Sequence, residues 1–249
     1  MTKQVAPYGS WPSPITTDLI TADVVGLAEI RADGEDLYWI EARPAEKGRS
    51  VIVRRTADGC IEDAIPPAFN ARTRVHEYGG GTYLVRQGEL VFSNFADQRL
   101  YRTRAGESPV PLTPDEALRY ADGVVDISRE RYIYVREDHR DAEAEAVNAL
   151  VAVPFAGGEG HVLTRGFDFY AAPRLSPNGR RLAWVCWNHP NMPWDDTELW
   201  LADLGPDGGV ENARRVAGGP GVSVVDPVWS PDGLLYYVSD ESGWWNIHC

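Results

Sequence analysis

The residues best suited to chemistry in this 249-residue chain are His76, Glu77 and Tyr78, which precede three consecutive glycines. A carboxylate on an inner loop could accept a charge-assisted hydrogen bond from a free peptide amine. The glycines would let another backbone approach closely. The same run could instead be a Gly-rich turn that leads into a strand. We therefore name Glu77 and Tyr78 as candidate substrate-binding residues and keep the turn as the competing interpretation.

Three further segments have unusual composition. Residues 136–145 (REDHRDAEAE) form a charge run with one histidine, and we expect a solvated loop there rather than a metal site, which would need several converging ligands. Residues 189–196 (HPNMPWDD) form a long loop that either lines a cavity or packs as a rigid element. We expect Trp244 and Trp245 to pack the last sheet against its neighbours rather than to stack on a peptide.

Charge and cysteine usage narrow the classes of partner. The net charge is −13 and the pI about 4.8, which disfavours nucleic acid and anionic membrane surfaces. Cys60, Cys186 and Cys249 are widely spaced, so neither a metal motif nor a disulfide framework is indicated. This usage is typical of a reducing compartment. We expect a cytoplasmic protein that binds no cofactor, no metal, no nucleic acid and no membrane.

The elements that position these residues come from an internal repeat. Five short segments place an apolar residue and an aromatic residue on one face of a strand, because side chains alternate with a period of two. The aromatic members recur about every 40 to 55 residues, the spacing of propeller blades; they are Trp39, Phe92, Tyr134, Trp184 and Tyr237.

Turn signals and flanking strands complete each repeat. Tight turns such as residues 176–179 (SPNG) and 230–233 (SPDG) precede the aromatic strand. Further strands follow it, which predicts an all-β propeller of four-stranded antiparallel blades. An irregular β-sandwich is the alternative. We place the blades at about residues 24–66, 81–114, 124–165 and 170–218, with an incomplete fifth at 223–249.

The end of the chain falls within the fifth repeat. A propeller closes by packing its last blade on its first, and about four and a half blades do not close. The chain ends at Cys249, inside a strand predicted from residue 246, and an open blade would expose apolar surface and an unpaired edge. We therefore expect residues 1–249 to be an incomplete N-terminal propeller domain that continues past Cys249.

Several motifs are distinctive enough to indicate a family. They are residues 6–15 (APYGSWPSPI), 74–83 (RVHEYGGGTY), 136–151 (REDHR followed by AVNALV) and, most specific, 187–200 (WNHPNMPWD followed by ELW). With these motifs, the chain resembles the N-terminal propeller of the prolyl oligopeptidase family of serine peptidases. Its acylaminoacyl-peptidase-like and dipeptidyl-aminopeptidase-like members are the most similar.

The resemblance implies a seven-bladed propeller above a C-terminal α/β-hydrolase domain with a Ser-Asp-His triad. The propeller would restrict access to short peptides. The family's nucleophile lies in a G-x-S-x-G elbow, which this sequence lacks. Ser223 comes two residues after Gly221, as in the elbow, but Val225 stands where the second glycine should be. We therefore expect no catalytic residue in this chain and no activity from it alone. Its implied partners are a peptide substrate and its own hydrolase domain.

Two other classes of function stay open on the residues alone. One is a noncatalytic propeller that binds proteins or peptides. The other is a metal-dependent small-molecule enzyme, although five histidines and no repeat-phased ligands disfavour it. Within the peptidase class, the sequence does not distinguish removal of acylated residues, dipeptides or single amino acids.

Overall fold

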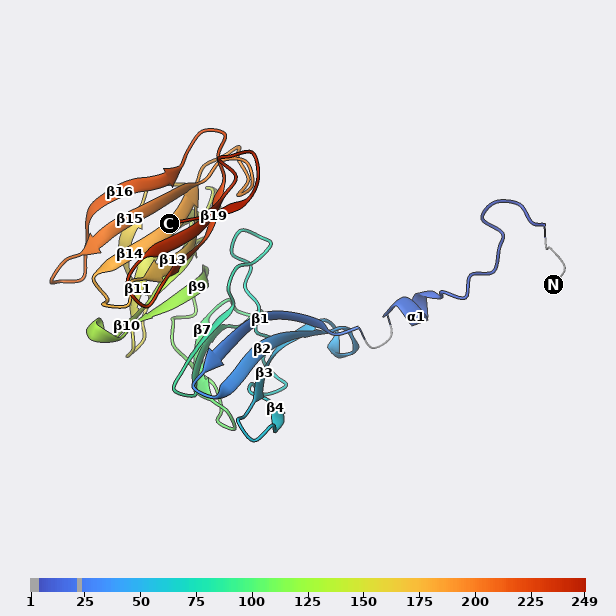
Figure 1. The fold of residues 1–249 in the computed structure, drawn as a ribbon. Helices are drawn as coiled ribbons and strands as arrows, with labels where there is room; N and C mark the ends of the chain where they lie inside the picture. Colours follow the sequence, from blue (N-terminus) through green and yellow to red (C-terminus); the bar gives the residue numbers. More distant parts are fainter. Residues whose placement is uncertain (1–4, 22–23) are drawn as a thin grey trace.

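The chain folds into five antiparallel sheets that follow one another along the sequence (Figure 1). A computed structural model describes residues 5–21 and 24–249. We call the sheets blades one to five. Their strands are β1 (Gly26–Asp33), β2 (Asp36–Arg43), β3 (Arg49–Arg55), β4 (Ile61–Asp63); β5 (Tyr83–Arg86), β6 (Glu89–Ser93), β7 (Leu100–Arg104), β8 (Val110–Pro111); β9 (Leu118–Asp126), β10 (Arg131–Asp138), β11 (Val147–Pro154), β12 (His161–Arg165); β13 (Phe169–Leu175), β14 (Arg181–Trp187), β15 (Glu198–Leu204), β16 (Val210–Gly218); and β17 (Val224–Trp229), β18 (Leu235–Ser239), β19 (Asn246–His248).

Each blade is a meander in which consecutive strands pair. The first strands of the blades pack against one another in chain order, from β1 through β5, β9 and β13 to β17. The predicted all-β propeller of four-stranded antiparallel blades is therefore confirmed. The count of about four and a half blades is corrected to five, because β19 already pairs with β18 through three residue pairs.

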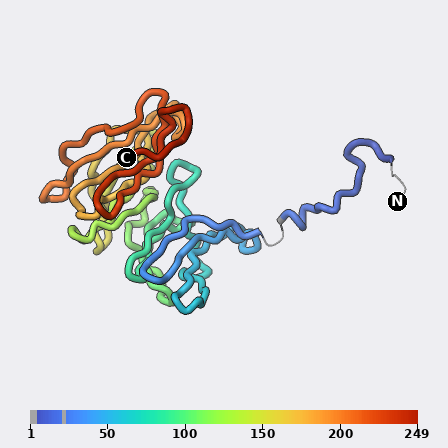
Figure 2. The backbone as a smooth tube through the Cα atoms, in the orientation of Figure 1, coloured from blue at the N-terminus to red at the C-terminus, as the bar shows by residue number. Residues whose placement is uncertain are grey.

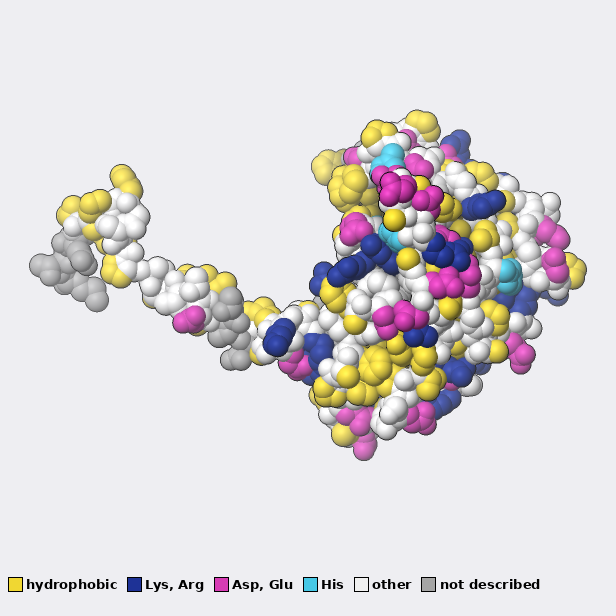
Figure 3. All heavy atoms as spheres, turned by 180° about the vertical axis from the view of Figure 1, so that it is seen from behind, with side chains coloured by type: hydrophobic (Ala, Val, Ile, Leu, Met, Phe, Trp, Pro, Cys, Tyr) yellow, Lys and Arg dark blue, Asp and Glu magenta, His cyan; other side chains and the backbone are white. Residues whose placement is uncertain are grey.

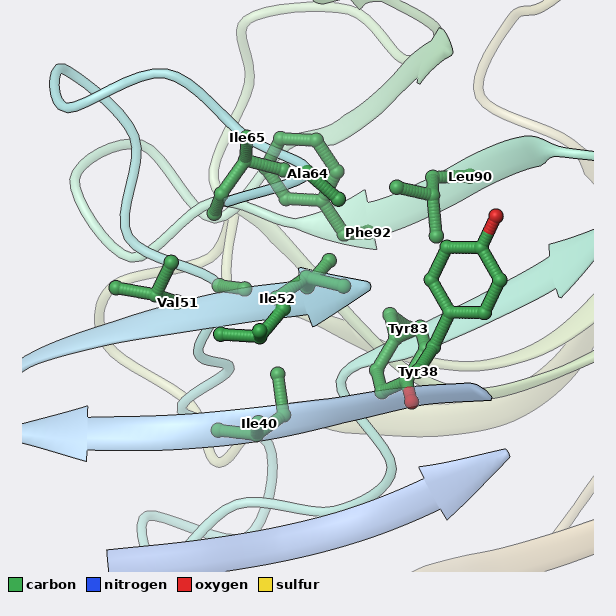
Figure 4. Close-up of a cluster of buried hydrophobic side chains, with 11 residues drawn as sticks. Tyr38, Ile40, Val51, Ile52, Ala64, Ile65, Tyr83, Leu90 and Phe92 are labelled. Atoms are coloured by element: carbon green, nitrogen blue, oxygen red, sulfur yellow. The ribbon is translucent and has the colours of Figure 1, made fainter. Parts of the chain in front are cut away.

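The hydrophobic core lies between neighbouring blades rather than within any one of them. In β14, Leu182, Trp184 and Cys186 pack toward blade three. The alternate residues Ala183, Val185 and Trp187 pack toward blade five. Because both faces of the strand are buried, its sequence is almost continuously apolar. Figure 4 shows the equivalent cluster between blades one and two, where Tyr38 and Ile52 meet Phe92.

The SPNG-type turns form as predicted. In blade four, the Gly179 amide donates to the Ser176 carbonyl at 2.8 Å, and the Arg181 amide donates to the Ser176 hydroxyl at 2.9 Å. In blade five, the Gly233 amide donates to the Ser230 carbonyl at 3.0 Å. These local bonds reverse the chain and set the register of the two strands that flank each turn.

The first strands of four blades contain a bulge that the sequence pattern does not reveal. One residue in each is left-handed, with φ of 51° at Glu29, 56° at Asp122, 49° at Ala172 and 51° at Asp226. A bulge breaks the period-two alternation. This explains why β9 begins at Leu118, whereas the sequence pattern placed the start of that blade near residue 124.

Two of these bulge residues connect blades through their carboxylates. Glu29 Oε2 accepts the Thr82 amide at 2.9 Å, from blade one to blade two. Asp122 in blade three accepts the Gly81 amide at 2.5 Å and the Ala172 amide at 3.0 Å. A carboxylate that accepts backbone N–H groups forms stronger bonds than a neutral acceptor. Asp122 thus ties together blades two, three and four.

Residues 5–21 extend away from the blades and end in the short helix α1 (Thr17–Thr21) (Figure 2). Tyr8, Trp11 and Ile15 are exposed there, and Figure 3 shows several apolar side chains on the described part of this arm. Within the described residues, no helix has the length and apolar character that a bilayer crossing requires. The expected packing of Trp244 and Trp245 is wrong, because their loop leaves them 80% and 49% exposed.

Candidate functional site

The sequence-predicted residues lie on the face where each first strand begins. In an up-and-down meander, the first and third strands start on the same face, and the second strand ends there. The segment before β5, the ends of β10 and β14, and the starts of β11 and β13 therefore meet. These segments contribute residues 76–78, 137–148, 168–169 and 187–192 to one cavity.

This cavity has a volume of about 430 Å³, and we call it the acidic pocket. Four carboxylates belong to it, which gives it a strong negative charge. Both predicted residues, Glu77 and Tyr78, lie at this cavity. Its lining residues are His76, Glu77, Tyr78, Glu137, His139, Glu145, Ala146, Asn148, Asp168, Phe169, Trp187, His189 and Met192.

The segment before β5 is both a turn and a wall of the pocket. His76 and Glu77 are left-handed, with φ of 58° and 64°, and Gly79 has φ of 96°. For a residue other than glycine this conformation costs about 1–2 kcal/mol. The His76 amide donates to Glu137 Oε1 at 2.7 Å, and the Gly79 amide donates to the Val75 carbonyl at 2.9 Å. These bonds hold the strained turn and direct its side chains toward the pocket.

Glu137 is the buried carboxylate of the pocket. Its Oε1 accepts the His76 amide, and its Oε2 lies 2.9 Å from His139 Nε2 and 3.6 Å from Arg119 Nη1. The expectation that residues 136–145 form a solvated loop is wrong for Arg136 and Glu137, which are buried in β10. The apolar residues just before them belong to the same strand, and that continuity was the signal for a strand here.

Glu77 and Tyr78 lie at the rim rather than at the floor. The Glu77 side chain is 78% exposed and pairs with Arg119 Nη1 at 2.6 Å. That hydrogen bond lowers the pKa of Glu77. Tyr78 is 60% exposed, and its ring lies 5.5 Å from the His76 ring. Arg119 lies near both carboxylates, at 2.6 Å from Glu77 and 3.6 Å from Glu137, so they differ chiefly in depth, with Glu137 buried and Glu77 exposed.

Aromatic rings form the opposite wall. Phe169 and Trp187 stack with their centroids 5.2 Å apart and an interplanar angle of 17°. The His76 ring lies 5.2 Å from Trp187, and the His189 ring lies 4.7 Å from Phe169. Burial lowers the pKa of His76 and favours the neutral imidazole. Ring faces of this kind attract cations.

Two buried acceptor atoms in the pocket have no partner among the described residues. They are His76 Nε2 and Asn148 Oδ1. Burial keeps the His76 imidazole neutral, and in the tautomer that has its proton on Nδ1, Nε2 is an acceptor. Buried polar atoms are nearly always satisfied in folded proteins. Orphan acceptors beside carboxylates and ring faces suit a ligand with several N–H donors, such as an ammonium group.

The loop of residues 189–196 was expected either to line a cavity or to pack as a rigid element, and it does both. His189 and Met192 line the acidic pocket. The His189 amide donates to Asp168 Oδ2 at 2.9 Å, and the Met192 amide donates to Asp195 Oδ2 at 3.0 Å, so local bonds hold the loop. Across residues 5–21 and 24–249, no three His, Cys, Asp or Glu side chains are arranged to hold a metal ion.

Consecutive blades that pack in chain order define a β-propeller, and one cavity on it gathers four carboxylates. No protein-family model matches the chain, and no curated protein matches it. Solved structures do match. A puromycin hydrolase mutant complexed with PGG is 38% identical with a TM-score of 0.89, over 98% of this chain and 40% of that chain. A puromycin-hydrolyzing peptidase of Mycobacterium tuberculosis is 39% identical with a TM-score of 0.87 and the same coverage.

The chain thus spans 40% of the length of these solved peptidases, while they cover nearly all of it. These matches confirm the resemblance to the prolyl oligopeptidase family, with this chain as the N-terminal propeller portion.

Proposed function

We propose that this chain is part of the substrate-selecting propeller of a cytoplasmic serine peptidase that hydrolyses short peptides. The complete propeller has seven blades and covers a C-terminal α/β-hydrolase domain, which carries the triad. The propeller limits access to that triad, and residues 1–249 alone are inactive. The similarity to puromycin-hydrolysing peptidases of greater length supports this proposal. Unpaired Cys60 and Cys249, both exposed, suit a reducing compartment.

The observation that best supports the proposal is the acidic pocket. We assign it as the site that binds the free amino end of a peptide. An ammonium group has three N–H donors. The Glu137 carboxylate, Asn148 Oδ1 and His76 Nε2 can each accept one, and the Trp187 face offers a cation–π contact. Glu77 borders the entrance at the rim, where it pairs with Arg119, and Tyr78 covers the bound end.

Amine recognition is tested with the full-length protein on a free short peptide and on the same peptide acetylated at its amino end. We expect the free peptide to be hydrolysed and the acetylated one to have a KM at least tenfold higher. A hydrogen bond to a charged group contributes about 1.5–3 kcal/mol, which corresponds to about 10-fold to 100-fold in affinity.

Glu137→Gln keeps an acceptor for the His76 amide but removes the charge, so it raises KM for the free peptide by the same factor. Glu62→Gln is the matched control, because Glu62 is exposed on β4 and its ion pair within the described part of the chain is with Arg54, at 3.2 Å. Equal hydrolysis of the free and acetylated peptides would contradict the assignment of the pocket.

The catalytic part of the proposal is tested with a fluorophosphonate probe. The full-length protein is expected to be labelled, and residues 1–249 alone are not. If the full-length protein binds peptides but neither hydrolyses them nor reacts with the probe, the noncatalytic peptide-binding propeller is the correct class. Labelling of residues 1–249 would contradict the placement of the nucleophile in the hydrolase domain.

A further inference from the structure

A second cavity adjoins the acidic pocket toward the innermost strands. Its volume is about 260 Å³, and we call it the inner pocket. It shares His76, Tyr78 and Trp187 with the acidic pocket. Its far side is formed by Asp122, Arg174 and Asp226, from the first strands of blades three, four and five. The proposed function does not use these residues.

Arg174 presents an underused guanidinium to the inner pocket. The guanidinium has five N–H donors. Among residues 5–21 and 24–249 it donates one hydrogen bond, from Nη1 to the Pro173 carbonyl at 3.0 Å. Among the described residues, no carboxylate oxygen lies within 4.0 Å of it. Burial lowers the pKa of Arg174, so the charge is desolvated without a close counter-ion.

The nearest carboxylates are engaged or exposed. The two oxygens of Asp122 accept the amides of Gly81 and Ala172, which fixes them in the bulge. Asp226 is exposed on β17 and forms no ion pair with Arg174. Asp122 and Asp226 raise the pKa of Arg174 through space, which compensates its charge in part but uses none of its donors.

Two more buried polar atoms without partners lie behind the strand of Asp122, although neither belongs to the lining of the inner pocket. They are Arg31 Nε and the Tyr134 hydroxyl. A Cβ added to Gly81 would lie 3.6 Å from Arg31 Nη2, and one added to Gly123 would lie 2.4 Å from the Tyr134 ring. Arg31 therefore borders Gly81, whose amide Asp122 binds, and Tyr134 borders Gly123, the residue after Asp122. The unused donors that face the inner pocket itself are those of Arg174, whereas the acidic pocket presents unused acceptors.

We propose that Arg174 binds the terminal carboxylate of a short peptide whose amino end lies in the acidic pocket. This inference rests on the proposed function and adds a preference for peptides with a free carboxyl end. The planar guanidinium matches a carboxylate through two parallel hydrogen bonds. An extended peptide spans about 3.5 Å per residue, so a peptide of a few residues reaches from one adjoining pocket to the other.

The test compares a tripeptide with its C-terminal amide as substrates of the full-length protein. We expect the wild type to show a KM at least tenfold lower for the free acid, with a similar kcat. Arg174→Met raises KM for the acid about tenfold and leaves KM for the amide unchanged. Arg174→Lys keeps the positive charge but loses the planar guanidinium with its two parallel donors. Its preference for the free acid over the amide should therefore lie between those of the wild type and Arg174→Met. Arg180→Met, at an exposed position in the following turn, is the matched control.

Each outcome decides the matter. Equal wild-type KM values for acid and amide overturn the inference and leave the proposed function standing. Hydrolysis of neither peptide means that the proposed function itself has failed. If Arg174→Met raises KM for acid and amide alike, Arg174 has a structural role and the inference is wrong. The wild-type ratio of acid to amide decides even if that variant does not fold.

Discussion

Replacing Asp122 is expected to be among the most destabilising changes to a polar residue in this protein. Its side chain accepts the amides of Gly81 at 2.5 Å and Ala172 at 3.0 Å, one in each neighbouring blade. Hydrogen bonds to a charged group contribute about 1.5–3 kcal/mol each. The left-handed φ of 56° adds about 1 kcal/mol when alanine replaces aspartate.

For Asp122→Ala we therefore expect a loss of about 4–7 kcal/mol in the free energy of unfolding, against about 5–15 kcal/mol for a typical domain. Asp122→Asn keeps one acceptor and tolerates the left-handed backbone, so about 1.5–3 kcal/mol is expected. Asp226→Ala is the control, because Asp226 has the same conformation, with φ of 51°, but accepts no hydrogen bond from the described residues. It should cost about 1 kcal/mol.

The assay is urea unfolding of the protein, combined with hydrogen exchange at the Gly81 and Ala172 amides. Exchange should accelerate at both amides in Asp122→Ala and at neither in Asp226→Ala. The reasoning is refuted if the two alanine variants lose equal stability, or if Gly81 and Ala172 stay as protected in Asp122→Ala as in the wild type.

Two further predictions follow from packing and from burial. Gly123→Ala should lower the free energy of unfolding by several kcal/mol, because the new Cβ would lie 2.4 Å from the buried Tyr134 ring. Gly26→Ala is the control and should be near neutral, because its Cβ would meet Ala42 at an ordinary 3.5 Å. Equal stability of the two variants in thermal unfolding would contradict this prediction. Burial lowers the pKa of His76 below its usual 6.5. The unfolded chain therefore takes up a proton that the folded state resists, so stability is lost as the pH falls through about 6.5 and below. Asparagine tolerates the left-handed backbone, so His76→Asn removes the titrating group without added strain. Between pH 7.5 and pH 5.5, each about one unit from the usual histidine pKa, this variant should lose less stability than the wild type. Identical losses would show that His76 does not titrate in this range.

The sequence alone determined the repeat and therefore the fold. The aromatic strands and their turns are short-range features, since a period of two and an SPNG-type turn depend on neighbouring residues. Residues 176–179 and 230–233 indicated where strands begin, and the structure agrees. The motif of residues 187–200 was specific enough to indicate the family.

The tertiary structure alone decided which charged residues form the site. Glu137 reads as part of a solvated charge run, yet its bond to the His76 amide joins residues 61 positions apart. Arg174 carries no motif, and packing between the innermost strands partly buries it with no ion-pair partner among the described residues. A charge is exposed, paired or left unpaired according to which distant blade covers it. That covering depends on how whole sheets pack, and the pattern along one strand contains no record of it.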